Sequence, residues 1–368
     1  MQKNINICEV SELRKDPVSK EWVLIATARS KRPGAQKEKT KHLTQPRKTC
    51  PFCHLEQSGT RTFSLLYPLS SNSQYAKKLK KDGDVQMMQN KKWSLIVVPN
   101  KFPAVIPGKN FNKSRKGLYD IYPGRGHHEV LITASHDLDI GRMPLKEVEE
   151  VMRAYRDRFV DLSEKKHIKY ISLFHNHGQE AGASLSHPHS QILAIPVIPR
   201  DINNSLHGSK KYFLKNGRCV HCDMIKWEKK EKERIVFENN DFVVLCPFSS
   251  SVAFEIRIYP KKHGSYFEEI TSKQIKNLAE CFKLALNKMY KALDNPPFNY
   301  FLHTAPCDGI VKKAGKFIRA KKNYNHYHWH FEIHPKLSIW AGFELSTGME
   351  ISTVPPEYAA DTLRRTRI

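Results

Sequence analysis

His187-Pro188-His189-Ser190-Gln191 is the stretch of sequence that decides the fold and points to the chemistry. A β-strand directs alternate side chains to one face, so its two histidines and its glutamine would project together. A neutral imidazole binds metal ions or attacks phosphorus, and an amide donates hydrogen bonds. The simpler interpretation is a surface cluster in a chain with 18 histidines, so the surrounding sequence has to decide.

Length and composition indicate a globular protein. The chain has 368 residues, of which 40% are hydrophobic and 27% are charged, enough for one large domain or two medium domains. No apolar run is long enough to span a bilayer, and residues 1–14 lack the apolar core of a signal peptide, so we expect a cytoplasmic protein. Two CxxC pairs among the eight cysteines favour metal binding over disulfides in a reducing compartment.

The net charge of +24, from 61 Lys and Arg against 37 Asp and Glu, favours an anionic partner. The basic residues concentrate in three segments, 77–92, 210–234 and 312–322, which we expect to be mostly loops with few aromatic residues. Such runs are more often solvated than part of a nucleic-acid groove, so specific nucleic-acid binding is the less favoured interpretation. A nucleotide or a sugar phosphate would benefit from the same positive field.

The predicted elements recur in the same order in both halves. In the first half we expect strands at 21–26, 93–98 and 129–133, a helix at 145–162, and strands at 169–174 and 187–194. Pro196 and Pro199 end the last strand, and the polar stretch up to Lys215 is expected to be a linker. The second half repeats a strand at 254–259 and an amphipathic helix at 275–293.

Three motifs follow the same repeat. Cys50-Pro51-Phe52-Cys53 corresponds to Cys219-Val220-His221-Cys222, His136 to His263, and the opening stretch to His328-Trp329-His330-Phe331-Glu332. This order indicates an ancestral duplication. We therefore expect an α+β fold with two tandem domains, residues 1–200 and 201–368, each an antiparallel sheet with a helix packed on one face.

The repeat also predicts two metal sites. A CxxC pair supplies two thiolates, and tetrahedral zinc needs two further ligands, which histidines elsewhere in the fold can provide. A closed set of this kind leaves no open position, so the zinc would be structural. The predicted ligands are Cys50, Cys53, His136 and His187 in the first half and Cys219, Cys222, His263 and His328 in the second.

If His187 holds zinc, His189 is free for chemistry. A histidine that attacks a phosphoanhydride needs an unprotonated nitrogen and donors for the phosphoryl oxygens. We expect Gln191 and the backbone of Gly182, Ala183 and Ser184 to supply those donors. Arg29 and Arg32 would neutralise a diphosphate, with an exposed basic turn as the equally weighted alternative.

An ordered set of motifs matches a known family. The pieces are residues 14–25, the turn at 29–33, Cys50-Pro51-Phe52-Cys53, Pro99-Asn100-Lys101-Phe102-Pro103, Asn176 with Gly182-Ala183-Ser184, and residues 187–191. Over nearly its whole length the chain resembles the galactose-1-phosphate uridylyltransferase family, the transferase branch of the histidine-triad superfamily. This resemblance implies that the two tandem domains are histidine-triad-like.

The resemblance also implies a ping-pong reaction. The second histidine of the motif, here His189, would attack the α-phosphorus of UDP-glucose and form a uridylyl-histidine, which galactose 1-phosphate then discharges. Family members are usually homodimers in which the partner subunit completes the active site. The implied nucleotide contacts are Arg29, Arg32, Asn100, Asn176, Ser184 and Gln191, the implied hexose contacts are Gly342, Phe343 and Glu344, and the implied zinc ligands are the first set given above.

Two departures keep alternatives open. Lys101 stands where the family often has an acidic residue, which leaves the preferred base undecided. Some members bind iron in the second half, and His303, His328 and His330 match those histidines, but residues 200–206 offer only Asp201 in place of the glutamate. Two CxxC pairs instead resemble the ADP-glucose phosphorylase branch, so zinc is favoured at the second site.

The function accordingly has two alternatives. The same intermediate would serve an adenylyl-type nucleotidyltransferase or an ADP-glucose phosphorylase, because the nucleophile contacts the α-phosphate and not the base. The net charge alone suggests a nucleic-acid-binding histidine-triad protein, whose binding would depend steeply on salt.

Overall fold

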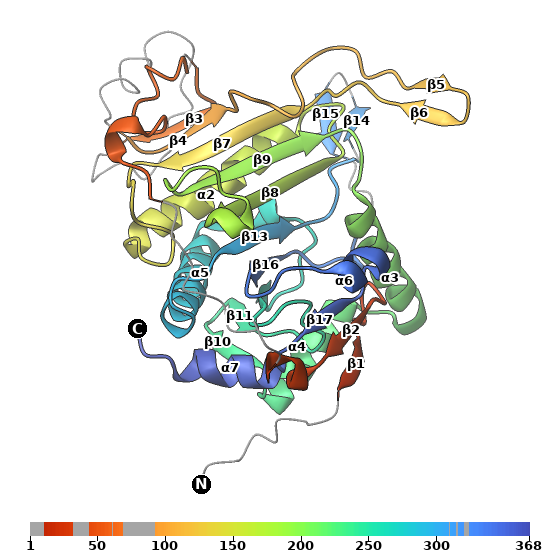
Figure 1. Cartoon of the computed structure of the whole chain (residues 1–368). Coiled ribbons are helices and arrows are strands. Elements are labelled where there is room, and N and C mark those ends of the chain that lie inside the picture. Colours follow the sequence, from red (N-terminus) through yellow and green to blue (C-terminus); the bar gives the residue numbers. More distant parts are fainter. Residues whose placement is uncertain are drawn as a thin grey trace.

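The structure, a computed structural model, describes residues 11–31, 44–60, 62–68, 93–308, 310–313, 316–319 and 324–368. Its main element is a ten-stranded sheet (Figure 1) with the spatial order β10-β11-β12-β16-β13-β8-β9-β7-β4-β3. Every neighbouring pair in this sheet is antiparallel. The first half supplies β3 (Leu65–Pro68), β4 (Trp93–Pro99), β7 (His127–Thr133), β8 (Tyr170–His177) and β9 (His189–Ile195). The second half supplies β10 (Ile235–Glu238), β11 (Phe242–Leu245), β12 (Ile256–Pro260), β13 (Phe298–His303) and β16 (His330–Pro335).

The strand order confirms the predicted repeat. Counted outward from the centre, β8, β9, β7, β4 and β3 on one side match β13, β16, β12, β11 and β10 on the other. Along the chain, α2 (Leu145–Ser163) lies between β7 and β8 in the first half, and α5 (Ser272–Ala292) lies between β12 and β13 in the second. The fold is therefore the α+β fold that the sequence predicted.

The two sheets are joined, which the sequence did not predict. Strand β8 pairs with β13, with Asn176 opposite Asn299 and His175 opposite Tyr300. An unpaired edge strand exposes backbone donors and acceptors, and pairing the innermost strands of the two halves removes both edges at once. The join places residues of the second half directly beside β8, one strand away from His189.

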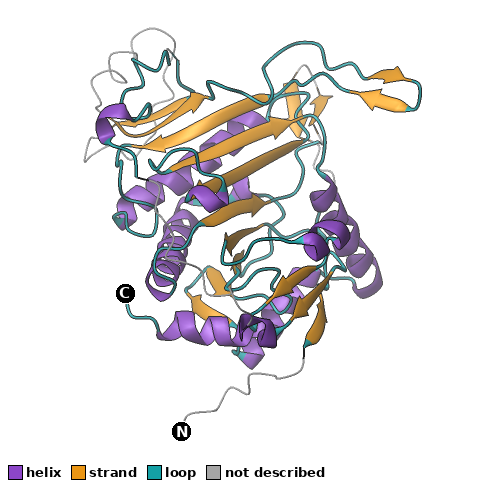
Figure 2. Cartoon of the chain, viewed as in Figure 1, coloured by secondary structure: helices purple, strands orange, loops and turns teal. Residues whose placement is uncertain are grey.

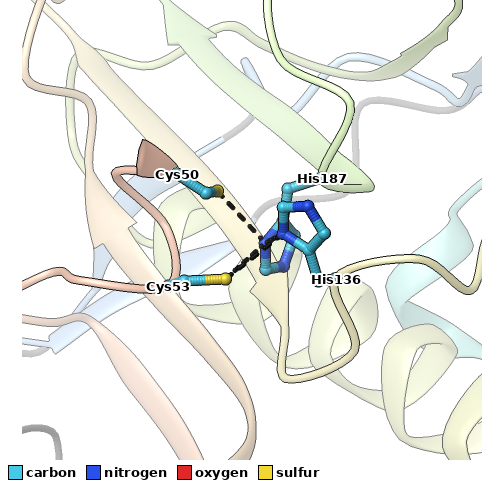
Figure 3. Close-up of side chains that lie close together, drawn as sticks. All are labelled: Cys50, Cys53, His136 and His187. Atoms are coloured by element: carbon cyan, nitrogen blue, oxygen red, sulfur yellow. Dashed lines mark hydrogen bonds between the residues drawn. The ribbon is translucent and has the colours of Figure 1, made fainter. Parts of the chain in front are cut away.

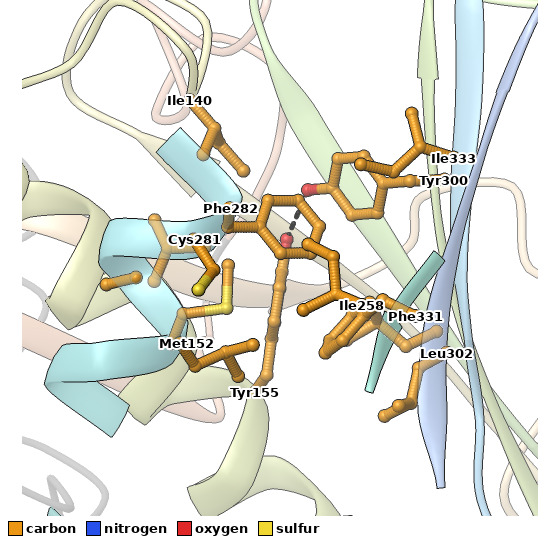
Figure 4. Packing of buried hydrophobic residues seen from close by; sticks show 14 of the residues in the cluster. Ile140, Met152, Tyr155, Ile258, Cys281, Phe282, Tyr300, Leu302, Phe331 and Ile333 are labelled. Atoms are coloured by element: carbon orange, nitrogen blue, oxygen red, sulfur yellow. Dashed lines mark hydrogen bonds between the residues drawn. The ribbon is translucent and has the colours of Figure 1, made fainter. Parts of the chain in front are cut away.

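One face of the sheet is covered by α2 and α5 (Figure 2). Both helices bury the apolar stripe that the sequence predicted, with Met152 and Tyr155 from α2 and Phe282 from α5 in the shared core (Figure 4). Thr271 starts α5 with a capping box, because its hydroxyl accepts the backbone N–H of Gln274 and the Gln274 side chain accepts the backbone N–H of Thr271. The two helices thus cover one face of the sheet, and the candidate site lies on the opposite face.

The predicted linker before Lys215 is wrong. Residues there form α3 (Arg200–Asn216), followed by α4 (Val220–Glu231). The helix starts after Pro199, ends at Gly217 with φ of 70°, and buries Ile202 and Leu206 against Tyr170 and Tyr327. Its many lysines and asparagines resemble a linker by composition, but the apolar residues keep helical spacing.

The same helices correct the expectation for one basic segment. Residues 210–234 lie mostly in α3 and α4 and not in a loop. Segment 77–92 lies outside the described residues, and segment 312–322 is described only where it enters β14 (Ile310–Lys313) and β15 (Lys316–Arg319).

The start of the chain packs on the second half. Strands β1 (Glu12–Lys15) and β2 (Trp22–Ile25) form a small sheet with β17 (Glu350–Ser352), which lies parallel to β2. Arg14 forms an ion pair of 2.9 Å with Glu357 at the start of α7 (Pro356–Arg365). Short elements complete the description: β5 (Ser114–Lys116) and β6 (Tyr119–Ile121) form a projecting hairpin (Figure 1), and α6 (Gly342–Thr347) precedes β17. In the described ranges, no helix has the length and apolar character that crossing a membrane requires.

Candidate active site and metal centres

The first predicted ligand set comes together in the structure (Figure 3). Cys50 and Cys53 flank the turn after the 3-10 helix η2 (Arg47–Thr49), His136 follows β7, and His187 precedes β9. Cys53 Sγ lies 3.2 Å from His136 Nδ1 and 3.5 Å from His187 Nδ1, and the two Nδ1 atoms lie 3.3 Å apart. All four side chains are buried, so this cluster is a closed cage of two sulfurs and two nitrogens.

Two backbone carbonyls set the tautomers of these histidines. His187 Nε2 lies 2.8 Å from Thr133 O, and His136 Nε2 lies 2.8 Å from Gln45 O. A carbonyl oxygen only accepts, so each Nε2 carries the proton and donates. Each Nδ1 therefore presents a lone pair to the centre of the cluster, which is the protonation state that a metal ligand needs.

The second ligand set is also assembled. Cys222 Sγ lies 3.4 Å from His263 Nδ1 and 3.5 Å from His328 Nδ1, and Cys219 completes the group. His328 Nε2 lies 2.9 Å from Pro260 O, which repeats the carbonyl contact of His187. The two clusters differ in exposure, because His263 is exposed and Cys222 is partly exposed.

His189 lies beside the first cluster, two residues after His187. Its Nδ1 donates to His187 O over 2.9 Å, and among the described residues Nε2 has no hydrogen-bond partner. The side chain is buried, with 8% exposed, and the Phe52 ring packs edge-on at 4.9 Å. Burial lowers the pKa of His189, outweighing the carbonyl hydrogen bond that raises it. A neutral imidazole with a free Nε2 is the form that attacks phosphorus.

Gln191 and Asn100 meet at His128, a residue that the sequence analysis did not single out. His128 Nε2 lies 2.8 Å from Gln191 Oε1 and 3.1 Å from Asn100 Nδ2. These residues come from β7, from β9 and from the end of β4, which are neighbours in the sheet. Two of the predicted nucleotide contacts are thus in one place.

Asn176 lies on β8 and is held by Asn299 of the second half. The Asn299 Nδ2 group donates to Asn176 Oδ1 and to Ala181 O, both over 2.8 Å. The loop that follows contains the 3-10 helix η3 (Gln179–Ala181) and Gly182, whose φ of +85° suits glycine. One amide from the second half therefore fixes both Asn176 and the start of the predicted phosphate loop.

The structure reduces the number of predicted phosphate donors in the loop at residues 182–184. The Gly182 N–H donates to Gln179 O over 2.9 Å, and the Ala183 N–H donates to Gly178 O over 3.1 Å. These two backbone groups are thus used within the loop and do not point to a ligand, contrary to expectation. Ser184 is exposed at the end of the segment and remains as its predicted donor.

The remaining predicted contacts are not brought to His189 of the same chain. Arg29 is exposed on the 3-10 helix η1 (Thr27–Lys31), directly after β2, and Gly342, Phe343 and Glu344 start α6. Figure 1 shows β2 and α6 on the right and lower side of the molecule, whereas β9 crosses the upper half. Arg32 lies outside the described residues.

A buried hydroxyl cluster supports β9 from behind. Tyr155 OH lies 2.6 Å from Ser190 Oγ and 2.6 Å from Tyr300 OH (Figure 4), and His175 Nδ1 lies 3.1 Å from the same serine oxygen. Ser190 faces opposite to its neighbours His189 and Gln191. The cluster joins α2, β8, β9 and β13, so both halves hold the histidine strand in place.

The alternative iron ligands are not brought together as one set. His328 faces the second cysteine pair, whereas His303 and His330 approach Glu332 at 3.5 Å and 3.1 Å. Asp201 lies exposed in the first turn of α3. His328 therefore belongs to the Cys2His2 group, whereas His303, His330 and Glu332 form a separate group that could also hold a metal ion.

Phe52, His128 and Asn299 are the residues that the sequence analysis missed. Phe52 was visible between the two cysteines of the first pair, and His128 precedes a predicted strand. Asn299 carries no local signal, because its role depends on the β8–β13 pairing.

Comparison with known proteins agrees with this geometry. Models of the galactose-1-phosphate uridyl transferase N-terminal and C-terminal domains match residues 2–199 and 205–363. The chain is 33% identical to ADP-glucose phosphorylase of Arabidopsis thaliana, covering 96% of this chain and 92% of that protein. It is 30% identical to galactose-1-phosphate uridylyltransferase of Thermotoga maritima, covering 97% and 99%.

Solved structures give the same result. A crystal structure of the Arabidopsis thaliana ADP-glucose phosphorylase with bound ADP-glucose superimposes with a TM-score of 0.75 at 31% identity, covering 98% of this chain and all of that one. A uridylyltransferase structure gives 0.67 at 26% identity, covering 97% and 98%. The chain belongs to the galactose-1-phosphate uridylyltransferase family.

Proposed function

We propose that this protein is a hexose-1-phosphate uridylyltransferase that transfers UMP from UDP-glucose to galactose 1-phosphate through His189. The observation that carries the proposal is the state of that imidazole: buried, with Nδ1 fixed by a carbonyl and Nε2 unpartnered in the described part of the chain. Family membership supports the same reaction.

The reaction then has two displacements. His189 Nε2 attacks the α-phosphorus of UDP-glucose, a P–N bond forms, and the bond to the bridging oxygen breaks to release glucose 1-phosphate. A phosphate oxygen of galactose 1-phosphate next attacks the same phosphorus, and the P–N bond breaks to give UDP-galactose. Gln191, Asn176 and Ser184 would donate to the phosphoryl oxygens, and Asn100 would contact the nucleoside.

We propose zinc for both clusters. Zinc bonds of about 2.0–2.3 Å give ligand–ligand distances of about 3.3–3.8 Å in a tetrahedron. The observed distances of 3.2–3.5 Å within the clusters support this ion, as do the two thiolates in each set. Both ions would be structural, because four protein ligands leave no position for substrate. None of the seven described cysteines forms a disulfide, which supports the cytoplasmic location expected from the sequence.

We also propose that the active unit is a homodimer. Figure 1 shows α6, which starts at Gly342, and β2, which precedes Arg29, away from β9, so a partner subunit would have to bring these residues to His189. Side chains in and near α6 support an interface, because Ile339 is 87% exposed and Leu345 is 70% exposed. In this arrangement each subunit supplies the nucleophile of one site and the hexose contacts of the other.

An ADP-glucose phosphorylase is the second candidate. Two observations favour it: the 33% identity to the Arabidopsis thaliana enzyme, and a Cys2His2 cluster in each half of the chain. Such an enzyme would form an adenylyl-histidine and discharge it with inorganic phosphate. The nucleophile would be the same, and only the nucleotide and the acceptor would differ.

One experiment separates the candidates. The protein is incubated with UDP-glucose or with ADP-glucose, and intact mass spectrometry detects a UMP or an AMP adduct. Galactose 1-phosphate and inorganic phosphate are then compared for their ability to discharge the adduct. We expect a UMP adduct that galactose 1-phosphate discharges, whereas an AMP adduct discharged by phosphate would establish the second candidate.

Matched variants test the nucleophile. His189→Asn should lower adduct formation by at least about 1,000-fold, whereas His330→Asn, at the corresponding position of the second half, should retain it. Zinc content and melting temperature are measured for both variants. An adduct in His189→Asn would overturn the mechanism. If the wild type formed no adduct with UDP-glucose or with ADP-glucose, nucleic-acid binding would be left as the interpretation of the net charge.

A further inference from the structure

His128 connects two segments of the proposed site. It is the second residue of β7 and is half-buried. Its Nδ1 lies 3.0 Å from Ala104 N, and its Nε2 lies 2.8 Å from Gln191 Oε1. Its backbone oxygen accepts the Asn100 N–H over 2.8 Å. One residue therefore joins the loop after β4 to the glutamine on β9.

The Ala104 contact determines the tautomer of His128. A backbone N–H is always a donor, so Nδ1 accepts and carries no proton. The proton of the neutral ring is then on Nε2, which donates to Gln191 Oε1. Because the oxygen of the Gln191 side chain is occupied in this way, its NH2 group is the part that remains for a ligand.

Asn100 makes a third contact with the His128 ring. Its Oδ1 accepts the Phe102 N–H over 2.8 Å, so its NH2 group is the part that lies 3.1 Å from His128 Nε2. In the assigned tautomer this pair has two N–H groups and no acceptor, so it forms no hydrogen bond, and the contacts with Ala104 and Gln191 decide the assignment. The opposite tautomer would accept from Asn100, but it would place an N–H against the Ala104 N–H and a lone pair against Gln191 Oε1.

We propose that His128 is a positioning residue for nucleotidyl transfer, which holds Gln191 with its NH2 group toward the α-phosphate. The inference rests on the proposed function. A phosphate presents only acceptor oxygens, so a reversed amide would place oxygen against oxygen. A free side-chain amide adopts both orientations, and the hydrogen bond from His128 selects the productive one.

A double-mutant cycle tests this inference. The variants are His128→Phe, Gln191→Ala and the pair, and the measurement is the single-turnover rate of adduct formation at saturating nucleotide sugar. Each single variant should be slower by about 10- to 100-fold, which corresponds to one hydrogen bond to a charged group. If His128 acts through Gln191, the double variant should be as fast as Gln191→Ala within about two-fold.

Two further variants complete the design. His128→Gln keeps a donor near the position of Nε2 and should recover most of the rate. His127→Phe changes the neighbouring residue, which would face the other side of the strand, and should leave the rate unchanged. Zinc content and melting temperature show that all variants are folded.

The outcomes are separable. An unchanged rate in His128→Phe, or single effects that multiply in the double variant, would overturn the inference while the proposed function stands. A wild-type protein without any adduct would overturn the proposed function, and the inference with it.

Discussion

Strand β9 of the first half and β16 of the second each begin at the second histidine of a His-x-His pair, but the two halves use that histidine differently. In both, this histidine donates from Nδ1 to the backbone oxygen of the first, over 2.9 Å for His189 and 3.0 Å for His330. His189 leaves Nε2 without a partner among the described residues, whereas His330 Nε2 lies 3.1 Å from Glu332 Oε1. The second copy satisfies its own imidazole and leaves nothing for a substrate.

The charge of the last residue in each five-residue motif, 187–191 and 328–332, explains why the two histidines are used differently. The first copy ends in Gln191, which is neutral, and the second ends in Glu332, which is buried and needs cations. Arg257 lies 3.3 Å from Glu332 and 2.7 Å from Glu255, and His334 lies 3.2 Å from Glu332. The comparison teaches that one amide-to-carboxylate difference separates an imidazole with an unpartnered nitrogen, among the described residues, from a closed ionic network.

The metal clusters divide the halves in another way. Both copies keep two cysteines and two histidines, but only the first cluster is buried throughout. Its ligand His187 also supplies the carbonyl that fixes His189. Loss of a metal ion from the first cluster should therefore disturb the position of His189, the proposed nucleophile, whereas loss of an ion from the second cluster should not.

Cys53→Ser and Cys222→Ser test this division, with the largest expected effect. Each variant should lose one of two zinc equivalents by inductively coupled plasma mass spectrometry. Cys53→Ser should also slow adduct formation by more than the roughly 10- to 100-fold that loss of an outer-shell partner costs, because a direct ligand is removed. Cys222→Ser should remain within a few-fold of the wild type. If the two variants lost equal activity, the halves would not be divided as proposed.

Much of the fold could be predicted because its signals are local. Helices were expected at 145–162 and 275–293 and occur at Leu145–Ser163 and Ser272–Ala292, since apolar residues recur at helical spacing. Helix α3 was missed because most of its residues are polar, which is typical of a linker, and only three of them are buried in the structure. The joining of the two sheets was missed because strand pairing between distant segments leaves no mark in either segment alone.

The site was predictable to the extent that the chain repeats it. The two candidate ligand sets were found because the pattern occurs twice in the same order, and the structure brings each set together as a cluster that could hold a metal ion. His128 and Asn299 were missed because their partners lie across a strand pairing. Arg29 was predicted from a motif, but it lies on η1 directly after β2, which Figure 1 shows away from β9.

Asn299 offers a test of how the second half serves the first. Asn299→Ala removes both hydrogen bonds from its amide, to Asn176 and to Ala181, and should slow adduct formation by about 5- to 100-fold at about 0.5–1.5 kcal/mol each. Asn239→Ala is a matched control, because that amide also donates to two acceptors, Asn277 O and Glu280. The control should retain the wild-type rate. Equal rates in the two variants would show that the second half does not position Asn176.

His334 offers the smallest and most specific test, because it probes the ionic network alone. Burial would lower its pKa, but attraction by Glu255 and hydrogen bonds to Glu255 and Glu332 raise it from 6.5 to about 9. Because the pKa is higher in the folded state than in the unfolded state, the charged imidazole stabilises the fold fully at pH values below the unfolded-state pKa. This stabilisation is lost as the pH rises through the folded-state pKa. The free energy of unfolding should therefore fall by about 1–3 kcal/mol between pH 6.5 and 9.

Urea unfolding at a series of pH values measures this slope. His334→Gln should flatten it, whereas His207→Gln, which changes an exposed histidine of α3, should keep it. The readout is unfolding and not adduct formation, because His334 lies opposite Asn299, which holds Asn176. An equal slope in His334→Gln and the wild type would mean that the carboxylates of the second half do not hold a charged imidazole. The closed network would then owe its stability to Arg257, the remaining cation between Glu255 and Glu332.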